Sequence, residues 1–415
     1  GPSPAWPITY ADLAPYYDRA EQLYHVHGRR GADPFEPPAG GPFPHGPVTH
    51  APRIAEVADG LRAYGLQPFE MPMGVKMSED DPGSGPFVLR ETFEAMGRAA
   101  FDGYPDLLHL KCDAEVATVK PATAHDNVHL LTGADVTRLV TSASGREVAA
   151  VEATVDGETR TFTADTFALC AGAVNSAALL LRSATRTQPD GLANRSGRVG
   201  RHFMRHVTSK FYSAASATPN PTQFQKTLAV NDFYFGVPGD PEWDGVPLGH
   251  IHLMGKHRGW QILQDLPMGA LTPHEADAFA ANSVDWWVQG EDLPLEDNRI
   301  TLGPDGGIRV RYTETNRKAQ EKLMDVLEEA LRTVGFDRFL RVPMPLGVVN
   351  HQCGTCRMGE DPATSVVDPN GKAHDLANLY LADASVFPSS AATNPTLTIA
   401  ANALRVAEHL QGEVL

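Results

Sequence analysis

The segment NHQCGTCRMG, residues 350–359, places a histidine and two cysteines within six positions. His351, Cys353 and Cys356 form an H-x-C-x-x-C array, and imidazole and thiolate side chains are common zinc ligands. The same spacing suits a redox dithiol, because C-x-x-C thiols at a helix start have lowered pKa values. A third possibility is that His351 acts alone as a catalytic base, since the pKa of imidazole lies near neutral pH.

Two of these three interpretations lack residues that they require. A structural zinc site needs a fourth ligand, and neither Cys112 nor Cys170 has a partner at ligand spacing. A redox dithiol needs a helix after it, and no helical pattern follows Cys356. The sequence therefore predicts no metal site, and buried packing is the alternative role for the two cysteines. His351 stays a candidate base, although one histidine among 16 is more often structural.

The composition argues against several classes of partner. The chain has 415 residues, 42% of them hydrophobic, which is enough for a substantial core in two domains. The formal net charge of -16 opposes binding to nucleic acid and to anionic membranes. No apolar run approaches the roughly 20 residues that span a bilayer. Few cysteines and no signal-peptide features in the first residues predict a cytoplasmic location.

Local patterns predict the elements that must position His351. An apolar run at 166–170, the small-residue turn 171–173 and the apolar segment after it predict a strand–turn–helix unit. Near the C-terminus, a strand at 378–382 precedes a loop and a helix that opens at Asn394 and Pro395. Further predictions are helices over 9–26 (interrupted near Pro15), 51–66 and 317–336, a β-meander over 127–164, and strands within 231–236, 249–255 and 283–290.

The motif around His351 and the segment NLYLADASVFPSSAATNPTLTIAANALRVAEHL together resemble the C-terminal part of the glucose–methanol–choline (GMC) flavoprotein oxidoreductases. Further matches to this family follow its order along the chain, at 4–21, 127–139, 169–183, 196–206 and 291–310. The segments FDGYPDLLHLKCDAEV and NPTLT most resemble the branch that contains pyranose oxidases and related sugar oxidoreductases.

The resemblance implies FAD-dependent oxidation of a secondary hydroxyl group of a pyranose sugar or glycoside to a ketone. His351 matches the base that takes the hydroxyl proton, while the carbon-bound hydrogen leaves as hydride to flavin N5. Asn394 matches the partner of this base, and both residues, together with Gln352, are expected to bind the substrate. From the residues alone, an ordinary helix N-cap is the preferred role for Asn394.

The resemblance also implies contacts with FAD. The matching positions are Val136, Ala171, Gly172, Ala173, Asp383, Ala384, Asn394, Pro395 and Thr396. The helix that starts at Pro395 is expected to direct its positive end toward the flavin. Plain alternatives are close packing for the turn 171–173, a β-core position for Val136 and an ordinary strand-end role for Asp383.

One part of the family pattern is missing from the sequence. Members begin with a strand–G-x-G-x-x-G–helix unit for the FAD pyrophosphate, and this chain contains no such unit. Three explanations stay open: a processed fragment whose N-terminal part is a separate chain, the ordered portion of a longer chain, and a homologue that has lost flavin binding. The intact His351 and Asn394 favour the first two. FAD binding by this chain alone is expected to be weak or absent.

The expected fold is α/β with two interleaved domains of the GMC type. An incomplete Rossmann-like FAD-binding domain consists of 86–202 and 351–415. An α+β substrate domain with an antiparallel sheet consists of 1–85 and 203–350. Loose candidates for the sugar pocket are Gln223, Gln225, His252, Trp286 and Gln289.

Two other functions stay open at this stage. A choline-like or other alcohol dehydrogenase, or a lyase on the same scaffold, would use an aromatic cage with a carboxylate, which the segment DWW at 285–287 could supply. A flavin-free, non-catalytic subunit is the alternative outside enzyme chemistry. The expected partners are a sugar or glycoside, an electron acceptor (oxygen or a quinone), and a separate N-terminal fragment or a second copy of the chain.

Overall fold

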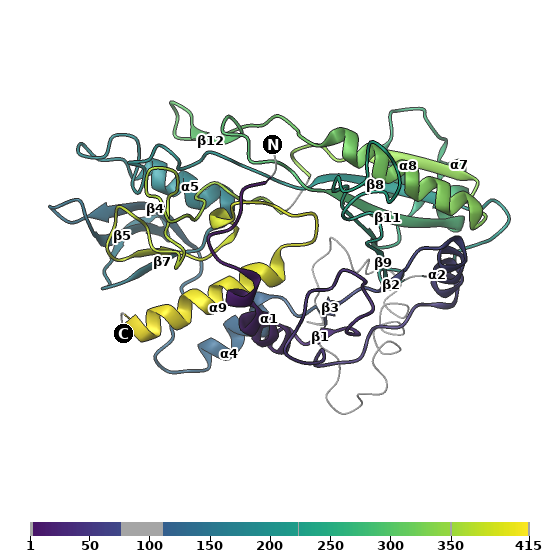
Figure 1. The fold of residues 1–415 in the computed structure, drawn as a ribbon. Coiled ribbons are helices and arrows are strands. Elements are labelled where there is room, and N and C mark those ends of the chain that lie inside the picture. The colour runs from purple at the N-terminus through teal and green to yellow at the C-terminus, as the bar shows by residue number, and fades with distance from the viewer. Residues whose placement is uncertain (1–2, 76–110, 223, 349–350, 414–415) are drawn as a thin grey trace.

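The computed structural model describes residues 3–75, 111–222, 224–348 and 351–413 (Figure 1). Its helices are α1 (Tyr10–Leu23), α2 (Pro52–Tyr64), η1 (Glu115–Val119), α4 (Lys120–Thr123), α5 (Gly172–Arg182), α6 (Gly259–Asp265), α7 (Pro273–Asn282), α8 (Arg317–Thr333), η2 (Ala384–Val386) and α9 (Thr396–Glu413). Its strands are β1 (Val26–His27), β2 (Phe69–Glu70), β3 (Met73–Gly74), β4 (Ala134–Thr141), β5 (Val148–Val155), β6 (Glu158–Phe162), β7 (Phe167–Leu169), β8 (Val207–Ala214), β9 (Leu228–Val230), β10 (His250–Leu253), β11 (Ser283–Gly290), β12 (Arg299–Leu302), β13 (Ile308–Arg311), β14 (Arg338–Pro343) and β15 (Leu379–Leu381). The predictions for residues 76–110 and for Gln223 lie outside the described residues.

A six-stranded antiparallel sheet, in the order β14-β8-β11-β10-β9-β2, dominates one half of the molecule. Helix α8 packs on β8 and β11, and α7 packs against β8 (Figure 1). The predicted stripe of α8 faces the sheet, because Leu323, Leu327 and Leu331 are all fully buried. Strand β11 is buried along almost its whole length, including its polar residues Ser283, Asp285 and Gln289.

The other half contains a three-stranded meander, β4-β5-β6, and a parallel pair, β7 and β15. The parallel pair joins segments far apart in the chain, with Leu379 beside Phe167 and Leu381 beside Leu169. Helix α5 follows β7 and packs against β4 and η2. The combination of this parallel pair with a large antiparallel sheet confirms the α/β class and the expected antiparallel sheet.

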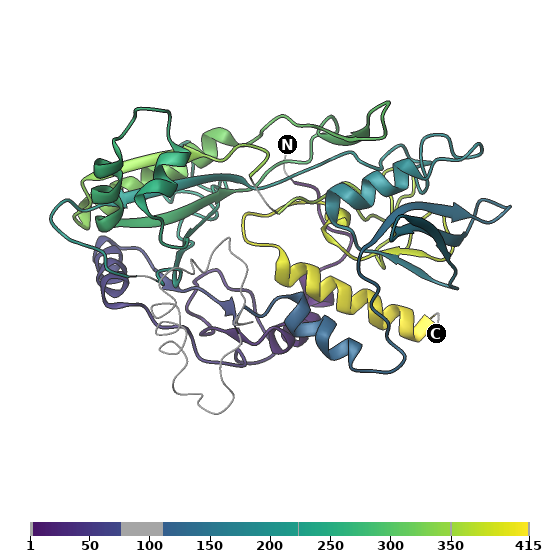
Figure 2. The same ribbon diagram turned by 180° about the vertical axis from the view of Figure 1, so that it is seen from behind.

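Helices α1 and α9 lie side by side, and α9 runs below the half that contains β4 and β5 (Figures 1 and 2). Helix α1 begins with a capping box, in which Thr9 and Asp12 bond each other's backbone N–H groups. The predicted interruption near Pro15 is wrong, since the helix continues to Leu23. Pro15 lies in the second turn, where it removes only one helical hydrogen bond.

The predicted strand at 231–236 is also wrong. The chain turns here, with Tyr234 N bonded to Asn231 O at 2.8 Å and Gly236 N bonded to Phe233 O at 3.1 Å. Strand β9 has already ended at Val230. Phe233 packs against the core of the large sheet from this turn and does not extend a strand.

No helix in the described part of the chain is both long and apolar enough to cross a membrane. The interleaved domain boundaries that the sequence predicts, near residues 85, 202 and 350, stay a proposal.

Truncation of the stripe on α8 should destabilise the protein. Leu327→Ala removes a fully buried side chain from the core between α8 and the sheet, so the free energy of unfolding should fall by about 2–5 kcal/mol. Ile308→Ala, at a position that is 38% exposed, is the matched control and should cost less than about 1 kcal/mol. Urea unfolding followed by fluorescence measures both. Equal losses for the two variants would show that α8 does not build this core.

Candidate active site

The segment that carries His351 runs antiparallel to the residues just before β8. Cys353 N bonds Met204 O, and Met204 N bonds Cys353 O, both at 3.0 Å. Two positions outward along an antiparallel pair, residues again face each other, so this pairing sets His206 opposite His351. The two rings meet edge to face, with centroids 4.7 Å apart and Nδ1 atoms 3.0 Å apart. His351 has a φ of 70°, a left-handed conformation that non-glycine residues seldom adopt.

The hydrogen bonds of His206 determine which nitrogen of His351 carries the proton. His206 Nε2 lies 3.3 Å from the carbonyl oxygen of Ser390, which can only accept, so Nε2 of His206 holds a proton. Neutral His206 then has its lone pair on Nδ1, and Nδ1 of His351 must donate to it. The lone pair of neutral His351 is therefore on Nε2, the atom that can take a proton from a bound hydroxyl group.

Burial keeps His206 in the neutral form that this chain of hydrogen bonds needs. Its side chain is fully buried. Burial, followed by the neighbouring His351, lowers the pKa of His206 to about 3, although the bond to Ser390 opposes the shift. At neutral pH, His206 therefore accepts a hydrogen bond at Nδ1 and donates one at Nε2.

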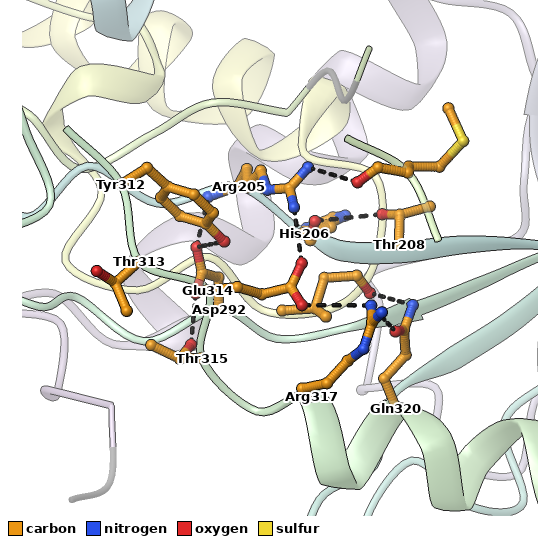
Figure 3. A network of polar contacts seen from close by, with 12 residues as sticks. Arg205, His206, Thr208, Asp292, Tyr312, Thr313, Glu314, Thr315, Arg317 and Gln320 are labelled. Atoms are coloured by element: carbon orange, nitrogen blue, oxygen red, sulfur yellow. Dashed lines mark hydrogen bonds and ion pairs between the residues drawn. The ribbon is translucent and has the colours of Figure 1, made fainter. Parts of the chain in front are cut away.

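A buried carboxylate, Asp292, organises the backbone on both sides of His206 (Figure 3). It is fully buried, and it accepts hydrogen bonds from Arg205 N at 3.1 Å, Tyr312 OH at 2.9 Å, the Thr315 hydroxyl and Leu293 N at 3.1 Å. Burial raises the pKa of Asp292, and the bonds from Thr315 and Arg205 act in the opposite direction. Four donors on one buried carboxyl group hold the surrounding loops in a single arrangement.

Asp292 also fixes the residue whose carbonyl orients His206. Its backbone N–H donates to Ser390 Oγ at 3.0 Å, and that hydroxyl donates to Asp292 O at 3.1 Å. The side chain of Arg205 strengthens the other side, through Glu314 at 2.8 Å and the Met344 carbonyl at 3.1 Å. One polar network thus includes the backbone next to His206 and the Ser390 residue that His206 contacts.

Asn394 lies in the loop between η2 and α9, close in sequence to Ser390. The first hydrogen bond of α9 runs from Ile399 N to Pro395 O at 2.9 Å, so the helix begins at Thr396, one residue later than predicted. Asn394 is exposed and lines a cavity of about 780 Å³ together with Leu397. The His206–Ser390 bond therefore connects His351 to the same loop that presents Asn394 to the cavity.

The predicted small-residue turn 171–173 becomes the start of α5. This helix begins at Gly172, whose φ of 78° places it in the left-handed region that favours glycine. Gly172 N and the Ser176 hydroxyl donate to the same oxygen of Asp383, at 2.8 and 2.5 Å, and Ser385 N donates to the other at 2.8 Å. Asp383 thus has the structural role of joining the start of α5 to the end of β15.

Some of the remaining predicted cofactor positions leave room for a bound dinucleotide, and others are buried. Ala171 is exposed at the N-terminus of α5, and a Cβ atom built at Gly172 would meet no atom within 4 Å, so a ligand can approach the backbone. Val136 is 38% exposed on β4, which makes the core alternative for this residue wrong. Thr396 is exposed at the start of α9, whereas the remaining three positions are buried: Ala173, Ala384 and Pro395.

The cysteines of the opening motif are packing residues. Both are buried in one hydrophobic cluster, and burial raises the pKa of Cys353 above the usual thiol range and that of Cys356 to about 12. Neither forms a disulfide. Among the described residues, no group of three or more histidine, cysteine or acidic side chains is arranged to hold a metal ion.

Most of the loose candidates for the sugar pocket belong to the interior of the sheet. Gln225 donates to Met254 O at 3.2 Å, and Trp286 donates to Ser213 Oγ at 3.0 Å. His252 and Gln289 are also buried. The cavity wall formed by the described residues contains none of these four, and their place in a sugar pocket stays a prediction. The structure gives Gln352 a partly buried position beside His351.

Sequence reasoning missed His206, Ser390 and His250, which also lines the cavity. The segment 196–206 matched the family pattern, but nothing local distinguishes His206 from a structural histidine. The alternation H-I-H in β10 was a usable signal, because residues two apart in a strand lie on the same face.

The chain is similar to known proteins over almost its whole length. Two family models described as GMC oxidoreductase match residues 91–208 and 294–403. The chain is 31% identical to a 6'''-hydroxyparomomycin C oxidase of Streptomyces lividus, over 98% of this chain and 73% of that protein. It is 28% identical to a paromamine 6'-oxidase of Streptomyces fradiae, over 99% of this chain and 72% of that protein.

The fold is similar to that of a solved structure. A crystal structure of pyridoxine 4-oxidase from Mesorbium loti superposes with a TM-score of 0.64 at 18% identity, covering 98% of this chain and 78% of that chain. At this identity the likeness concerns the fold, which agrees with the α/β arrangement described above.

The buried state of His206 should make stability depend on pH. Its pKa is about 3 when folded and about 6.5 when unfolded, so below pH 6.5 the unfolded chain binds a proton that the folded chain does not. The contribution of His206 to stability should be constant above pH 7 and should be lost as the pH falls below 6.5. Between pH 7.5 and pH 5, we expect the free energy of unfolding of His206→Asn to fall by about 2 kcal/mol less than that of the wild type.

Urea unfolding at several pH values measures this difference. His125→Asn, at an exposed histidine, is the control and should keep the slope of the wild type. If His206→Asn and the wild type lose the same stability over this range, His206 is not held neutral by burial.

Proposed function

The chain belongs to the GMC oxidoreductase family, and we propose that it oxidises a hydroxyl group of a pyranose sugar or glycoside. Membership makes the protein an FAD-dependent oxidoreductase that acts on CH–OH groups. The names of the two Streptomyces relatives support a sugar as the substrate class, because both are aminoglycoside oxidases.

The observation that carries this proposal is the hydrogen-bonded series from Ser390 through His206 to His351. This series of hydrogen bonds favours the tautomer of His351 that has the proton on Nδ1 and the lone pair on Nε2. Such an imidazole can take the proton of a substrate hydroxyl, which increases electron density on the carbon that must lose hydride. A neutral, buried His206 also stabilises the imidazolium that results at His351, because its Nδ1 keeps accepting the same hydrogen bond.

Asn394 is proposed to hold the reacting hydroxyl through its amide group. Two observations favour this role over a helix cap: α9 begins at Thr396, and Asn394 is exposed at the wall of the cavity. An amide donor beside the base fixes the orientation of the hydroxyl and lowers the entropy cost of proton transfer. Substrate binding by Gln352, next to the base, stays part of the proposal.

FAD binding by this chain is proposed on the fit of its residues. The exposed backbone at Ala171 and Gly172, the open face at Val136 and the N-terminal end of α9 at Thr396 would hold the cofactor. When bound, FAD supplies the acceptor for the hydride that leaves the substrate carbon. Oxygen or a quinone is the proposed final electron acceptor.

Two products fit this chemistry. The prediction from sequence is a secondary hydroxyl group, which gives a ketone. The relative named paromamine 6'-oxidase supports a second candidate, because position 6 of a hexopyranose is a primary alcohol whose oxidation gives an aldehyde. The choline-like alternative has lost its structural support, since Trp286 and Asp285 are fully buried and Asp285 accepts hydrogen bonds from Ser283 and His257.

Removal of the base should weaken turnover far more than substrate binding. His351→Ala in the FAD-loaded protein should lower kcat/KM for an aminoglycoside such as paromamine about 10²–10⁴-fold, because proton transfer loses its acceptor. The Kd for paromamine should rise far less, about 10-fold at most, since one hydrogen bond to the hydroxyl group is lost. Anaerobic stopped-flow absorbance measures the rate, and calorimetry measures Kd. His125→Ala, at an exposed histidine, is the matched control.

The product identifies the hydroxyl group. Carbon-13 NMR of the paromamine product distinguishes an aldehyde at position 6' from a ring ketone. If no sugar or aminoglycoside bleaches the flavin of the loaded protein, or if His351→Ala retains wild-type kcat/KM, the proposed function is wrong.

A further inference from the structure

One histidine of the cavity wall formed by the described residues, His250, has no role in the chemistry described above. It is the first residue of β10, it is only 7% exposed, and it lines the same cavity as Asn394. Its ring stacks on His252 with centroids 4.8 Å apart. A buried imidazole that reaches a cavity wall is costly unless both nitrogens are satisfied, so each nitrogen needs an explanation.

The Nδ1 atom of His250 belongs to a short series of side chains. His250 Nδ1 lies 2.6 Å from Asn231 Oδ1, and Asn231 Nδ2 donates to Asp33 Oδ2 at 2.5 Å. The other oxygen of Asp33 accepts from Phe35 N at 2.9 Å. Asp33, Asn231 and His250 all line the cavity, and no described residue hydrogen-bonds to Nε2 of His250.

This series fixes the tautomer of His250. A carboxylate can only accept, so Asp33 turns the NH₂ group of Asn231 toward itself and the amide oxygen toward His250. That oxygen also only accepts, so Nδ1 of His250 carries the proton. Burial, followed by Lys226, lowers the pKa of His250 to about 4, and the ring is therefore neutral near pH 7. Its lone pair is left on Nε2.

The charges around the cavity favour a ligand that donates hydrogen bonds and carries positive charge. Arg30 pairs with Glu21 and with Glu36, and Arg29 pairs with Glu70 at 3.1 Å. Among the described residues, the wall contains five acidic and three cationic side chains: Asp18, Glu21, Asp33, Glu36 and Glu70 against Arg29, Arg30 and Lys226. A neutral acceptor within an acidic wall suits an ammonium group as well as a hydroxyl group.

We propose that His250 is a substrate-binding residue whose Nε2 accepts a hydrogen bond from an N–H or O–H donor of the sugar, with Asn231 and Asp33 as positioning residues that hold the required tautomer. This inference rests on the proposed function for the substrate class, and it assigns the specificity of the same site. The base, His351, and the acceptor, His250, then approach the sugar at different places, because each belongs to its own series of hydrogen bonds.

The first test is the tautomer, which does not require activity. Two-bond ¹⁵N–¹H correlation spectra of histidine-labelled protein show which ring nitrogen carries the proton, and the spectrum of His250→Phe assigns the signal. We expect an Nδ1–H tautomer at pH 7 in the wild type and a mixture of tautomers in Asn231→Leu. An Nε2–H tautomer in the wild type would overturn the inference.

The second test is binding of paromamine by calorimetry. His250→Phe should raise the Kd about 5- to 10-fold, because one hydrogen bond is lost. The control is His274→Phe, at an exposed histidine on α7, which should leave the Kd unchanged. N-acetylated paromamine identifies the donor: an ammonium donor makes the loss larger for paromamine, whereas a hydroxyl donor gives equal losses. An unchanged Kd in His250→Phe overturns the proposal.

Different results would reject the role of His250 and the proposed function. Bleaching of the flavin by paromamine with an unchanged Kd in His250→Phe rejects only the role of His250. A locked tautomer and weakened binding in His250→Phe, without any oxidation of bound paromamine, keep the binding site and reject the oxidation.

Discussion

The burial of one carboxyl group, Asp292, is the constraint on which the site depends. A carboxylate without solvent must be satisfied by protein donors, and Asp292 takes them from the backbone before β8, from the loop after β11 and from Thr315 ahead of α8. Its own backbone and the Ser390 hydroxyl bond each other in both directions. These contacts join the large sheet to the loop before α9.

Next to this network two histidines, His206 and His351, are in contact, and the proposed chemistry depends on that contact. His206 is brought opposite His351 by the Met204–Cys353 pairing, and the Ser390 carbonyl decides its tautomer. A carbonyl group that can only accept thus determines, two hydrogen bonds away, which nitrogen of the proposed base, His351, holds the lone pair. In the series from Asp33 to His250 at the cavity wall, a group that only accepts hydrogen bonds likewise sets the proposed tautomer of a histidine. In both cases a group of fixed polarity removes the ambiguity of imidazole.

Local signals were sufficient for elements with strong patterns. The apolar run before Ala171 and the stripe of α8 each predicted an element of the structure, because burial on one face repeats with the period of the element. The prediction at 231–236 was wrong, because an aromatic residue such as Phe233 can pack on the core from a turn as well as from a strand. Pro15 was given too much weight, since a proline early in a helix removes only one hydrogen bond.

The site was predictable only in part. The spacing around His351 and the helix start near Asn394 are local features. The contact of His351 with His206 joins residues 145 positions apart, and the Ser390 carbonyl is a backbone atom that any residue type would supply. No periodicity reports such a pairing. It depends on the antiparallel register of Met204 and Cys353, which is a property of the folded chain.

The most direct measurement is the tautomer of His351 in the FAD-loaded protein at neutral pH, by two-bond ¹⁵N–¹H correlation, compared with His206→Phe. The account predicts a proton on Nδ1 and a lone pair on Nε2 in the wild type, and a mixture of tautomers once the acceptor at position 206 is gone. A wild-type His351 protonated on Nε2, or a tautomer that does not respond to His206→Phe, would contradict the claim that the Ser390–His206 series prepares the base.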